Sequence, residues 1–302
     1  MPEVFLDHGV ALIGPGHDGP WQPGRTGIDA GEFVRRFAED LRSGDLLLLR
    51  TALDQVAAVG LVASEYEFLE PFDDVNGWNL RHGRRVRWCR LPEPYRFAAN
   101  VFGATPRRLA RVKNEEAVRY ARSFLTSGLT HWREAPLPAL PEAEPLLDEV
   151  PESLRNVVGL ARDLAGLYGD EERLGDAPNE NEMTAHFIVP FLRALGWPQE
   201  LIAVEWRRID VALFETLPRT PENCRFVIEA KRLGTGLAPA RKQAEAYVAE
   251  LGVSRDVVVS DGFRYRIFDH EKNFAPVAYA NLARLKPSSV ALFDRLRHAQ
   301  GV

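Results

Sequence analysis

The sequence predicts two domains: a small barrel-like β-sheet with a few helices, followed by a mixed α/β sheet flanked by helices. Three observations predict this. The length of 302 residues suffices for two packed domains of about 100–200 residues each. Residues 131–152 carry five prolines and a run of acids, which is typical of an extended linker. Before this segment, the hydrophobic pattern is mostly that of short strands; after it, predicted strands alternate with longer predicted helices. We therefore expect domains at residues 1–130 and 153–302.

Composition narrows the class of protein. With 45% hydrophobic and 27% charged residues, the chain has the composition of a globular protein. No apolar run approaches the roughly 20 residues needed to span a bilayer, and the first residues lack the pattern of a signal peptide. We expect a cytoplasmic protein with no membrane partner. Cys89 and Cys224 form no paired-spacing motif, so we expect reduced thiols rather than a disulfide or a zinc site.

The first half reads as a sheet interrupted by loops. Five glycines and three prolines in residues 14–27 forbid regular structure there. Asp29 with Glu32 three residues later predicts a helix start, and Phe33, Phe37 and Leu41 have helical spacing. Thr105-Pro106 predicts the start of another helix. Apolar runs and period-2 alternation predict strands at Val10–Ile13, Leu46–Leu49, Val56–Ser64 and Arg84–Leu91.

After a first helix, the second half predicts a helix, three strands, a further helix and three more strands. Apolar residues at helical spacing predict helices over 152–168, 181–195 and 238–251. Strands are predicted at 201–206, 209–214, 225–230, 256–260, 263–268 and 276–282. This order is typical of a mixed central sheet with flanking helices.

The distribution of charge matters more than its sum. The net charge of −5 by itself argues against a nucleic-acid partner. Between Arg81 and Lys113, however, ten basic residues stand against one acid, Glu93. We expect this segment to contact the DNA backbone, through Arg84, Arg85, Arg87, Arg107 and Arg108; for any single arginine a solvated face is an equal alternative.

The second half carries a set of residues suited to phosphodiester hydrolysis. Hard divalent cations require carboxylate oxygens, and hydrolysis also benefits from a cation beside the attacking water. Glu229 and Lys231 project to the same face of the strand that contains FVIEAK, and Asp210 on a neighbouring strand could join them. Only five of the 38 basic residues are lysine, which makes Lys231 stand out. The alternative is a structural ion pair, which would be costly in a central strand.

Five blocks in this half resemble the PD-(D/E)xK nucleases, specifically the nuclease module of type I restriction motor subunits. They are ENEMTAHFIVPFLRALGW (180–197), RRIDVALF (207–214), FVIEAKRLG (226–234), QAEAY (243–247) and VVVSDGFRYRIFD (257–269). The resemblance implies that Asp210, Glu229 and the carbonyl of Ala230 bind Mg²⁺, which Mn²⁺ could replace. It implies that Lys231 positions the water, and that Gln243 and Tyr247 match a Q-x-x-x-Y element. Glu182 would add a metal ligand from the first helix, because it fits the spacing to the LGW block better than Glu180; a helix-start carboxylate is the alternative.

The first half resembles, less specifically, the EVE branch of the PUA-like fold, whose relatives include YTH modified-base readers. The matching text is GDLLLLR (44–50), VAAVGLVASEYEF (56–68) and WNLRHGRRVRWCRL (78–91). The family's signature near the first helix is replaced here by GRTGIDAGEF (24–33). A base reader needs aromatic walls for a flipped base. The candidates are Trp21, Arg25 and Trp78, with plugging of the barrel end as the alternative for the tryptophans.

Together these resemblances predict a modification-dependent restriction endonuclease. It would flip a modified cytosine, such as 5-methylcytosine or 5-hydroxymethylcytosine, out of double-stranded DNA and cut nearby. Cutting both strands with single active sites would need a homodimer. The glycines of the first loop are not followed by Gly-Lys-Ser/Thr, so no nucleotide cofactor is expected, and we interpret His17-Asp18 as turn residues. The alternatives are a non-catalytic reader of modified nucleic acid and an RNA-directed nuclease.

Overall fold

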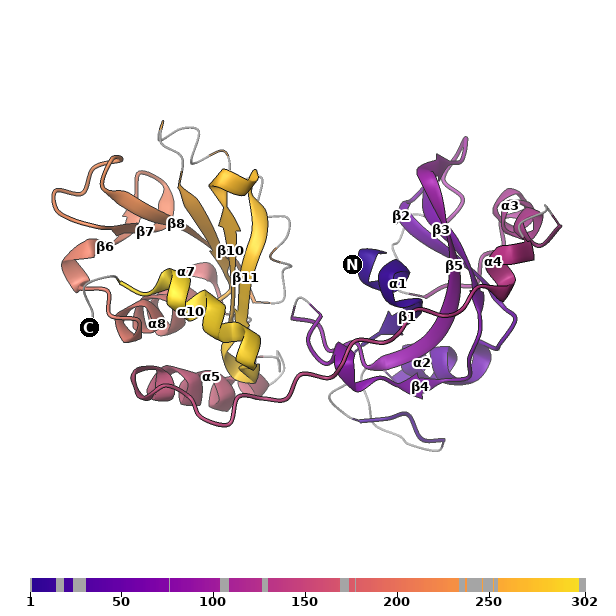
Figure 1. Ribbon diagram of the computed structural model, residues 1–302, viewed down its shortest axis with the longest axis horizontal. Helices are drawn as coiled ribbons and strands as arrows, with labels where there is room; N and C mark the ends of the chain where they lie inside the picture. Colours follow the sequence, from indigo (N-terminus) through magenta and orange to yellow (C-terminus); the bar gives the residue numbers. More distant parts are fainter. Residues whose placement is uncertain are drawn as a thin grey trace. The chain divides into compact units, whose positions relative to one another are not determined.

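The chain forms two compact units, residues 1–143 and 144–302, in the computed structural model (Figure 1). The structure describes residues 2–14, 19–23, 31–75, 77–103, 109–126, 130–168, 174–176, 178–233, 237, 246, 252 and 255–298. None of the helices in these ranges has the length and apolar content that crossing a lipid bilayer requires.

Unit 1 is built on a curled, half-barrel sheet of antiparallel strands. The strand order is β1-β5-β3-β2, and β4 also pairs with β5. The strands are β1 (Val10–Ile13), β2 (Leu46–Ala52), β3 (Gln55–Val62), β4 (Glu67–Phe68) and β5 (His82–Arg96). The helices are α1 (Pro2–His8), α2 (Gly31–Arg35) with η1 (Arg36–Asp40), η2 (Glu70–Phe72), α3 (Glu115–Thr126) and α4 (Thr130–Glu134).

Strand β5 joins the two sides of this sheet. Its first residues pair with β1, with Val10 opposite Arg85, while later residues pair with β3, with Val59 opposite Cys89. The apolar side chains of β1 and β5 pack on Val34 and Phe37 of the helical segment 31–40. Long strand β5 is therefore the element that both sides of the half-barrel share.

The proline-rich segment packs along unit 1 before it reaches unit 2. Arg85 Nη2 donates to the carbonyl oxygen of Pro138, and Arg87 Nε donates to that of Ala135 at 3.1 Å. Leu140 packs on the cluster that contains Val10 and Leu12. The first residues of the predicted linker, up to Glu134, belong to helix α4; the proline-rich residues after them have no helix or strand and are attached to the sheet.

Unit 2 contains a six-stranded mixed sheet in the order β11-β10-β9-β8-β7-β6. The strands are β6 (Ile202–Trp206), β7 (Ile209–Phe214), β8 (Cys224–Ala230), β9 (Asp256–Ser260), β10 (Arg264–Asp269) and β11 (Ala275–Asn281). The helices are η3 (Glu152–Leu154), α5 (Arg155–Tyr168), α7 (Glu180–Met183), η4 (Thr184–Ile188), α8 (Val189–Ala194), η5 (Gln199–Leu201), η6 (His270–Lys272), η7 (Leu282–Arg284), η8 (Pro287–Ser289) and α10 (Val290–Leu296).

Within this sheet β8 and β9 are parallel and the other neighbouring pairs are antiparallel. Strand β8 therefore lies in the middle of the sheet, between antiparallel β7 and parallel β9. Its burial explains the apolar run FVI that precedes Glu229. The two central strands end side by side, with Ala230 opposite Ser260.

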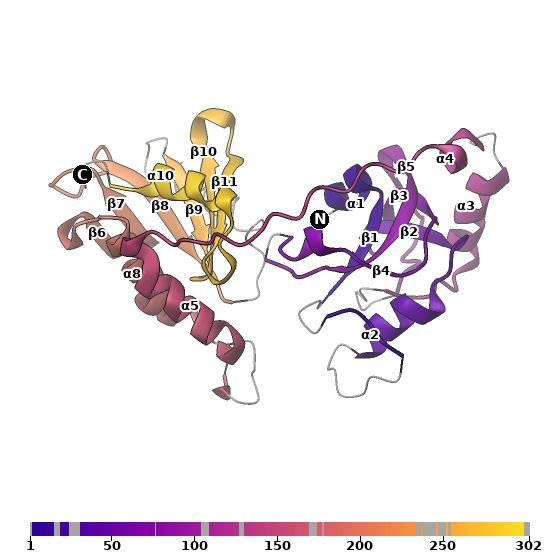
Figure 2. The ribbon, with the colours of Figure 1, turned by 60° about the horizontal axis from the view of Figure 1, so that its bottom comes forward.

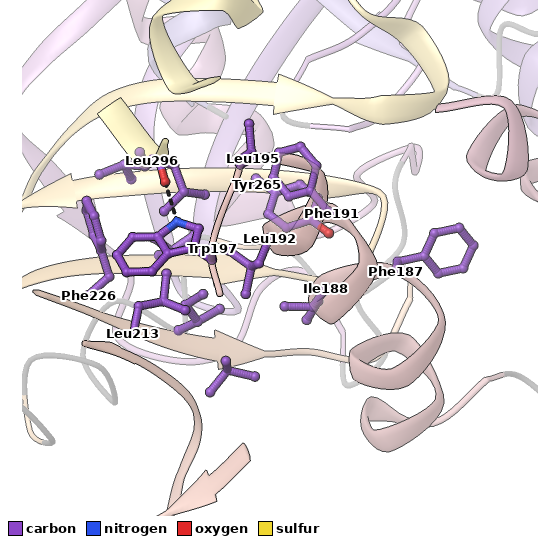
Figure 3. Packing of buried hydrophobic residues seen from close by; sticks show 14 of the residues in the cluster. Phe187, Ile188, Phe191, Leu192, Leu195, Trp197, Leu213, Phe226, Tyr265 and Leu296 are labelled. Atoms are coloured by element: carbon purple, nitrogen blue, oxygen red, sulfur yellow. Dashed lines mark hydrogen bonds between the residues drawn. The ribbon is translucent and has the colours of Figure 1, made fainter. Parts of the chain in front are cut away.

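One large apolar cluster joins the sheet of unit 2 to its helices (Figure 3). The ring centroids of Phe191 on α8 and Tyr265 on β10 lie 4.3 Å apart, and Phe191 also meets Phe293 of α10. Trp197 is buried against Phe226, and its indole Nε1 donates to the Leu296 carbonyl at 2.7 Å. Figure 2 shows α5 and α8 side by side along the strands. This packing holds the helices of unit 2 against the sheet whose strands carry the candidate site.

The architecture confirms the coarse prediction of a two-domain α/β protein with one barrel-like and one mixed sheet. The bounds of β1, β7 and β9 coincide with the predicted strands. Strand β5 is longer than predicted at both ends. The predicted helix over 238–251 and the predicted helix start at Thr105-Pro106 lie outside the described residues, apart from Ala246.

Candidate functional site

Carboxylates from neighbouring strands meet at one end of the unit 2 sheet. Asp210 follows Ile209 at the start of β7, and the pair Val211–Ile228 places Asp210 beside Glu229 on β8. The pairs Val204–Val211 and Trp206–Ile209 bracket Asp210 on its other side, which places Glu205 of β6 opposite it. The sheet register therefore brings the predicted residues Asp210 and Glu229 together and adds Glu205, which the sequence analysis missed.

Asp210 is partly buried and is held by the backbone of β8. Its Oδ2 accepts a hydrogen bond from the amide of Ala230 at 2.7 Å. Burial raises the pKa of Asp210 above its ordinary value, and the charges of Glu180 and Glu205 raise it further; the Ala230 amide and Lys231 oppose this shift. The site thus disfavours a bare negative charge on Asp210.

Glu229 is almost fully buried, with 2% of its surface exposed. Its Oε1 accepts a hydrogen bond from Lys231 Nζ at 2.5 Å, whereas Oε2 has no hydrogen-bond partner among the described residues. Burial raises the pKa of Glu229, and repulsion by Asp210 adds to the shift, against the effect of Lys231. A buried carboxylate oxygen without a donor, beside a second carboxylate, fits a divalent cation.

Lys231 is fixed at the point where β8 ends. Its backbone amide donates to the carbonyl oxygen of Ser260, the last residue of β9, at 2.7 Å. Its side chain is mostly buried and reaches back to Glu229. The predicted arrangement, a carboxylate and an ammonium on one strand end with the backbone of Ala230 between them, is therefore present.

The two helix carboxylates, Glu182 and Glu180, have different surroundings. Glu182 occupies the third position of helix α7, where its Oε2 accepts from the amide of Asn179 at 2.9 Å while Asn179 Oδ1 accepts from the Glu182 amide. This reciprocal capping box uses the Glu182 carboxylate to begin the helix. Glu180 is instead the helix residue whose charge raises the pKa of both Asp210 and Glu229. In this structure the Glu182 carboxylate caps α7, and its role as a metal ligand stays a prediction beside the alternative, Glu180.

Helix α7 is held near the strand ends by a close contact with the β9–β10 turn. Gly262 has a φ of +86°, and a Cβ at this position would lie 2.5 Å from Cε of Met183. Both the backbone conformation and the contact favour glycine here. The turn therefore sets how closely the helix that carries Glu180 approaches the site.

Several predicted residues lie outside the described part of the chain. These are Gln243 and Tyr247 of the nuclease resemblance, Arg25 of the base-binding set, and the backbone-contact residues Arg107 and Arg108. Their roles remain predictions.

Arg84 is a structural residue rather than a phosphate contact, which corrects the prediction. Only 1% of its side chain is exposed. Its guanidinium donates to the carbonyl oxygens of Phe37 at 3.1 Å, Ala38 at 2.7 Å and Ser64 at 3.1 Å. It therefore bonds the end of the helical segment 31–40 to the sheet and cannot reach a DNA backbone.

Arg85 and Arg87 are partly exposed, but both already have bonds within unit 1. As described above, they donate to the carbonyls of Pro138 and Ala135 and so hold the proline-rich segment on the sheet. In this structure these two guanidinium groups hold the chain itself, and a phosphate contact through their other donors stays a prediction.

The two candidate base-binding tryptophans have different surroundings. Trp21 packs on the cluster around Phe37, its backbone amide donates to the Tyr66 hydroxyl at 2.8 Å, and its Nε1 donates to Glu39 at 3.1 Å. The same hydroxyl lies 2.8 Å from Nδ1 of the buried His82. Trp78 is 36% exposed beside a short bridge to Val75. Trp21 thus belongs to a polar and aromatic group, whereas Trp78 is exposed on a loop.

A second acidic group in unit 2 is an ion-pair network. Asp256, Asp269 and His270 lie close enough together for their side chains to share a cation. Arg295 of α10, however, donates to Asp256 at 2.8 Å and to Asp269 at 2.9 Å, and His270 Nδ1 lies 2.8 Å from Asp256. The guanidinium already supplies the positive charge, so this group fastens α10 to the sheet.

Comparisons with known proteins give limited matches. A family profile described as a domain of unknown function, DUF8426, matches residues 20–101, which lie within unit 1. A solved structure, described as a fragment of an HsdR subunit of a type I restriction enzyme from Vibrio vulnificus YJ016, is 21% identical with a TM-score of 0.28. That match covers 39% of this chain and 25% of the other. No curated protein matches the chain.

Proposed function

We propose that this protein is a Mg²⁺-dependent endonuclease that cuts double-stranded DNA carrying a modified base, with a role in restriction. The observation that carries the proposal is the pair of carboxylates Asp210 and Glu229 on adjacent strand ends, with the ammonium of Lys231 beside them. The same residues match the PD-(D/E)xK pattern in the sequence, which supports assigning unit 2 to that fold.

The donor set fits a hard divalent cation. Asp210 and Glu229 would hold the cation through carboxylate oxygens, with the carbonyl of Ala230 and the carboxylate of Glu180 as further candidates. The unpartnered Oε2 of Glu229 is the oxygen with the greatest need for a positive neighbour. When bound, Mg²⁺ would supply charge for the phosphoryl oxygens and lower the pKa of water.

The chain's own residues would orient the reaction. Lys231 would place its ammonium where an attacking water and the phosphate meet, because its backbone is fixed by Ser260 and its side chain by Glu229. The amide of Ala230 fixes the Asp210 carboxylate at the edge of the site. Each reacting group is thus held by a rigid strand end and not by a free loop.

Unit 1 is proposed as the base reader. The PUA-like resemblance of the sequence and the curled sheet support this role, and Trp21 and Trp78 are the candidates for stacking on a flipped base. Tyr66 and His82 extend the set around Trp21 with polar groups that could read a base edge. The base would be a modified cytosine, and a homodimer would cut both strands.

Digestion of one duplex in three forms tests this function. The DNA is prepared unmodified, 5-methylated and 5-hydroxymethylated at cytosine, with an RNA duplex of the same sequence, and each is incubated with Mg²⁺ or Mn²⁺. We expect cutting of modified DNA that disappears in the Lys231→Ala protein. Equal cutting of all three DNA forms would refute base recognition, and cutting that persists without Lys231 would refute the proposed site.

A further inference from the structure

The turn between β6 and β7 has an unusual combination of conformation and charge. Trp206 and Ile209 form the closing pair, and Arg207 and Arg208 are the two residues between them. Arg207 has a φ of 50° and Arg208 a φ of 69°. Two successive positive φ values define a type I′ hairpin turn, whose usual residues are Asn and Gly because they tolerate this conformation. Here both positions carry an arginine instead.

The two guanidinium groups are available for an external partner. Both arginines are exposed, and no described carboxylate lies within ion-pair distance of either, although the charge of Arg207 helps to lower the pKa of Glu222. The guanidinium carbon of Arg207 lies 4.8 Å from the centroid of the Trp206 ring. Stacking on a ring restricts the side chain while leaving its N–H donors free, so Arg207 is partly preorganised for an anion.

The turn lies at the same end of the sheet as the carboxylate cluster. Arg208 is two residues from Asp210, a span of about 7 Å along the strand. The helix rise of about 3.4 Å per phosphate is only the axial part of the separation of successive phosphates, which is longer along the backbone, so this span corresponds to the neighbouring phosphate. A DNA strand with one phosphate at Asp210 and Glu229 would therefore pass close to the turn.

Charge balance also calls for a cation at this position. The cluster of Glu180, Glu205, Asp210 and Glu229 repels a polyanion, and Lys231, which lies within it, is bonded to Glu229. In unit 1, Arg84, Arg85 and Arg87 are bonded to carbonyl oxygens of the chain. Exposed guanidinium groups beside the cluster would offset this repulsion through bidentate contacts to phosphate.

We propose that the Arg207–Arg208 turn is a DNA-phosphate clamp of the nuclease unit, which binds the strand next to the phosphate to be cut. The inference rests on the proposed function, since it assumes that DNA is the substrate. It assigns backbone binding to unit 2, at the turn that precedes Asp210 in the block RRIDVALF.

The test uses a substitution that removes both charges and suits the turn. Arg207→Asn/Arg208→Gly installs the pair that type I′ turns prefer, so the variant should melt at a temperature equal to or above that of the parent. The control, Arg155→Ala/Arg162→Ala, removes the same charge from exposed positions of helix α5 in the same unit. Binding of a fluorescent modified duplex is measured with Mg²⁺ in the Lys231→Ala background, in which cleavage should be slow. The KCl concentration is varied from about 50 to about 300 mM, a range that includes physiological salt.

We expect the turn variant to bind at least about tenfold more weakly at low salt, with the slope of log K against log[KCl] reduced by about 1.8, or about 0.9 per phosphate contact. The control should change neither quantity. An unchanged slope in a well-folded turn variant would overturn the clamp. That result is distinct from failure of the proposed function, which would appear as a parent protein that does not cut the duplex with Mg²⁺.

Discussion

Stabilisation by a divalent cation provides a direct test of the carboxylate site, before any substrate is known. Asp210 and Glu229 hold buried or half-buried negative charge, and one oxygen of Glu229 has no partner among the described residues. A cation that binds only the folded protein adds about 2.7 kcal/mol at a concentration of 100 times its Kd. For a unit of this size, each kcal/mol raises the Tm by about 2–4 °C, so Mg²⁺ should raise the Tm by about 5–11 °C.

The Glu229→Gln protein should lose most of this gain while remaining at least as stable as the parent without metal, because it no longer buries an unpartnered charged oxygen. A matched control is Glu215→Gln, which removes an exposed carboxylate directly after β7 that pairs with Arg225 at 2.6 Å. It should keep the full response to Mg²⁺. Thermal melts over a Mg²⁺ or Mn²⁺ titration measure all three proteins. A parent without a cation response, or an equal response in Glu229→Gln, would refute the reasoning.

The same site predicts how stability depends on pH. The pKa values of Asp210 and Glu229 are raised above 3.8 and 4.5, mainly by burial. In the pH range between the ordinary and the raised values, the folded state binds more protons than the unfolded state, so stability without metal falls as the pH rises. Cation affinity should rise over the same range, because protons and metal compete for the carboxylates. Melts at several pH values, with and without Mg²⁺, check both trends; a metal effect independent of pH would contradict them.

Three further predictions concern individual side chains. Lys231→Ala should slow cleavage of modified DNA by about 10²-fold or more while leaving the Mg²⁺-induced rise in Tm, as judged by single-turnover rates and melts. Glu180→Gln should reduce the rise in Tm that Mg²⁺ causes. Glu182→Ala should lower the stability by about 1 kcal/mol, because the capping box is lost, but should keep the full rise in Tm with Mg²⁺. The reverse pattern would identify Glu182 as the metal ligand. Arg84→Leu should destabilise unit 1 by at least about 3 kcal/mol in denaturant unfolding, because three carbonyl oxygens lose a charged donor. The control Arg90→Ala, which removes an exposed ion pair with Glu3, should cost no more than about 1 kcal/mol.

The main strands of the sheets could be predicted because their sequences carry local signals. Apolar runs rich in Val, Ile and Phe specify the buried strands β7, β8 and β9. The charged residues at the end of β8 could also be predicted, because i and i+2 share a face of a strand. The pairing of strands depends on contacts between distant residues, which is why Glu205 entered the site only through the register of β6 against β7.

The capping role of Glu182 could have been predicted from the sequence. Asn179 followed three residues later by Glu182 is the pattern of a capping box, and this pattern uses the glutamate to begin the helix. The choice of Glu182 as metal ligand followed the spacing to the LGW block and did not take this local signal into account. The competing electrostatic role of Glu180 depends on how the helix packs at Gly262, and no local pattern reports that contact.

The sequence of the basic segment in unit 1 also carried a local signal, which indicates that Arg84 is buried. In a strand, residue 84 shares a face with Val86 and Trp88, while Arg85 and Arg87 share the other face, so alternation alone places Arg84 toward the core. The net charge of the segment does not show that Arg84 is buried, because a count of charges treats every arginine as exposed. In the structure, much of the local positive charge is used within the chain: Arg84 on helix and loop carbonyls, Arg85 and Arg87 on the proline-rich segment. Charge that already has internal partners cannot also give unit 1 a strong affinity for bulk DNA. Arg207 and Arg208, which are exposed and have no ion pair among the described residues, therefore become the better candidates for backbone binding. The salt dependence of DNA binding should respond to the β6–β7 turn.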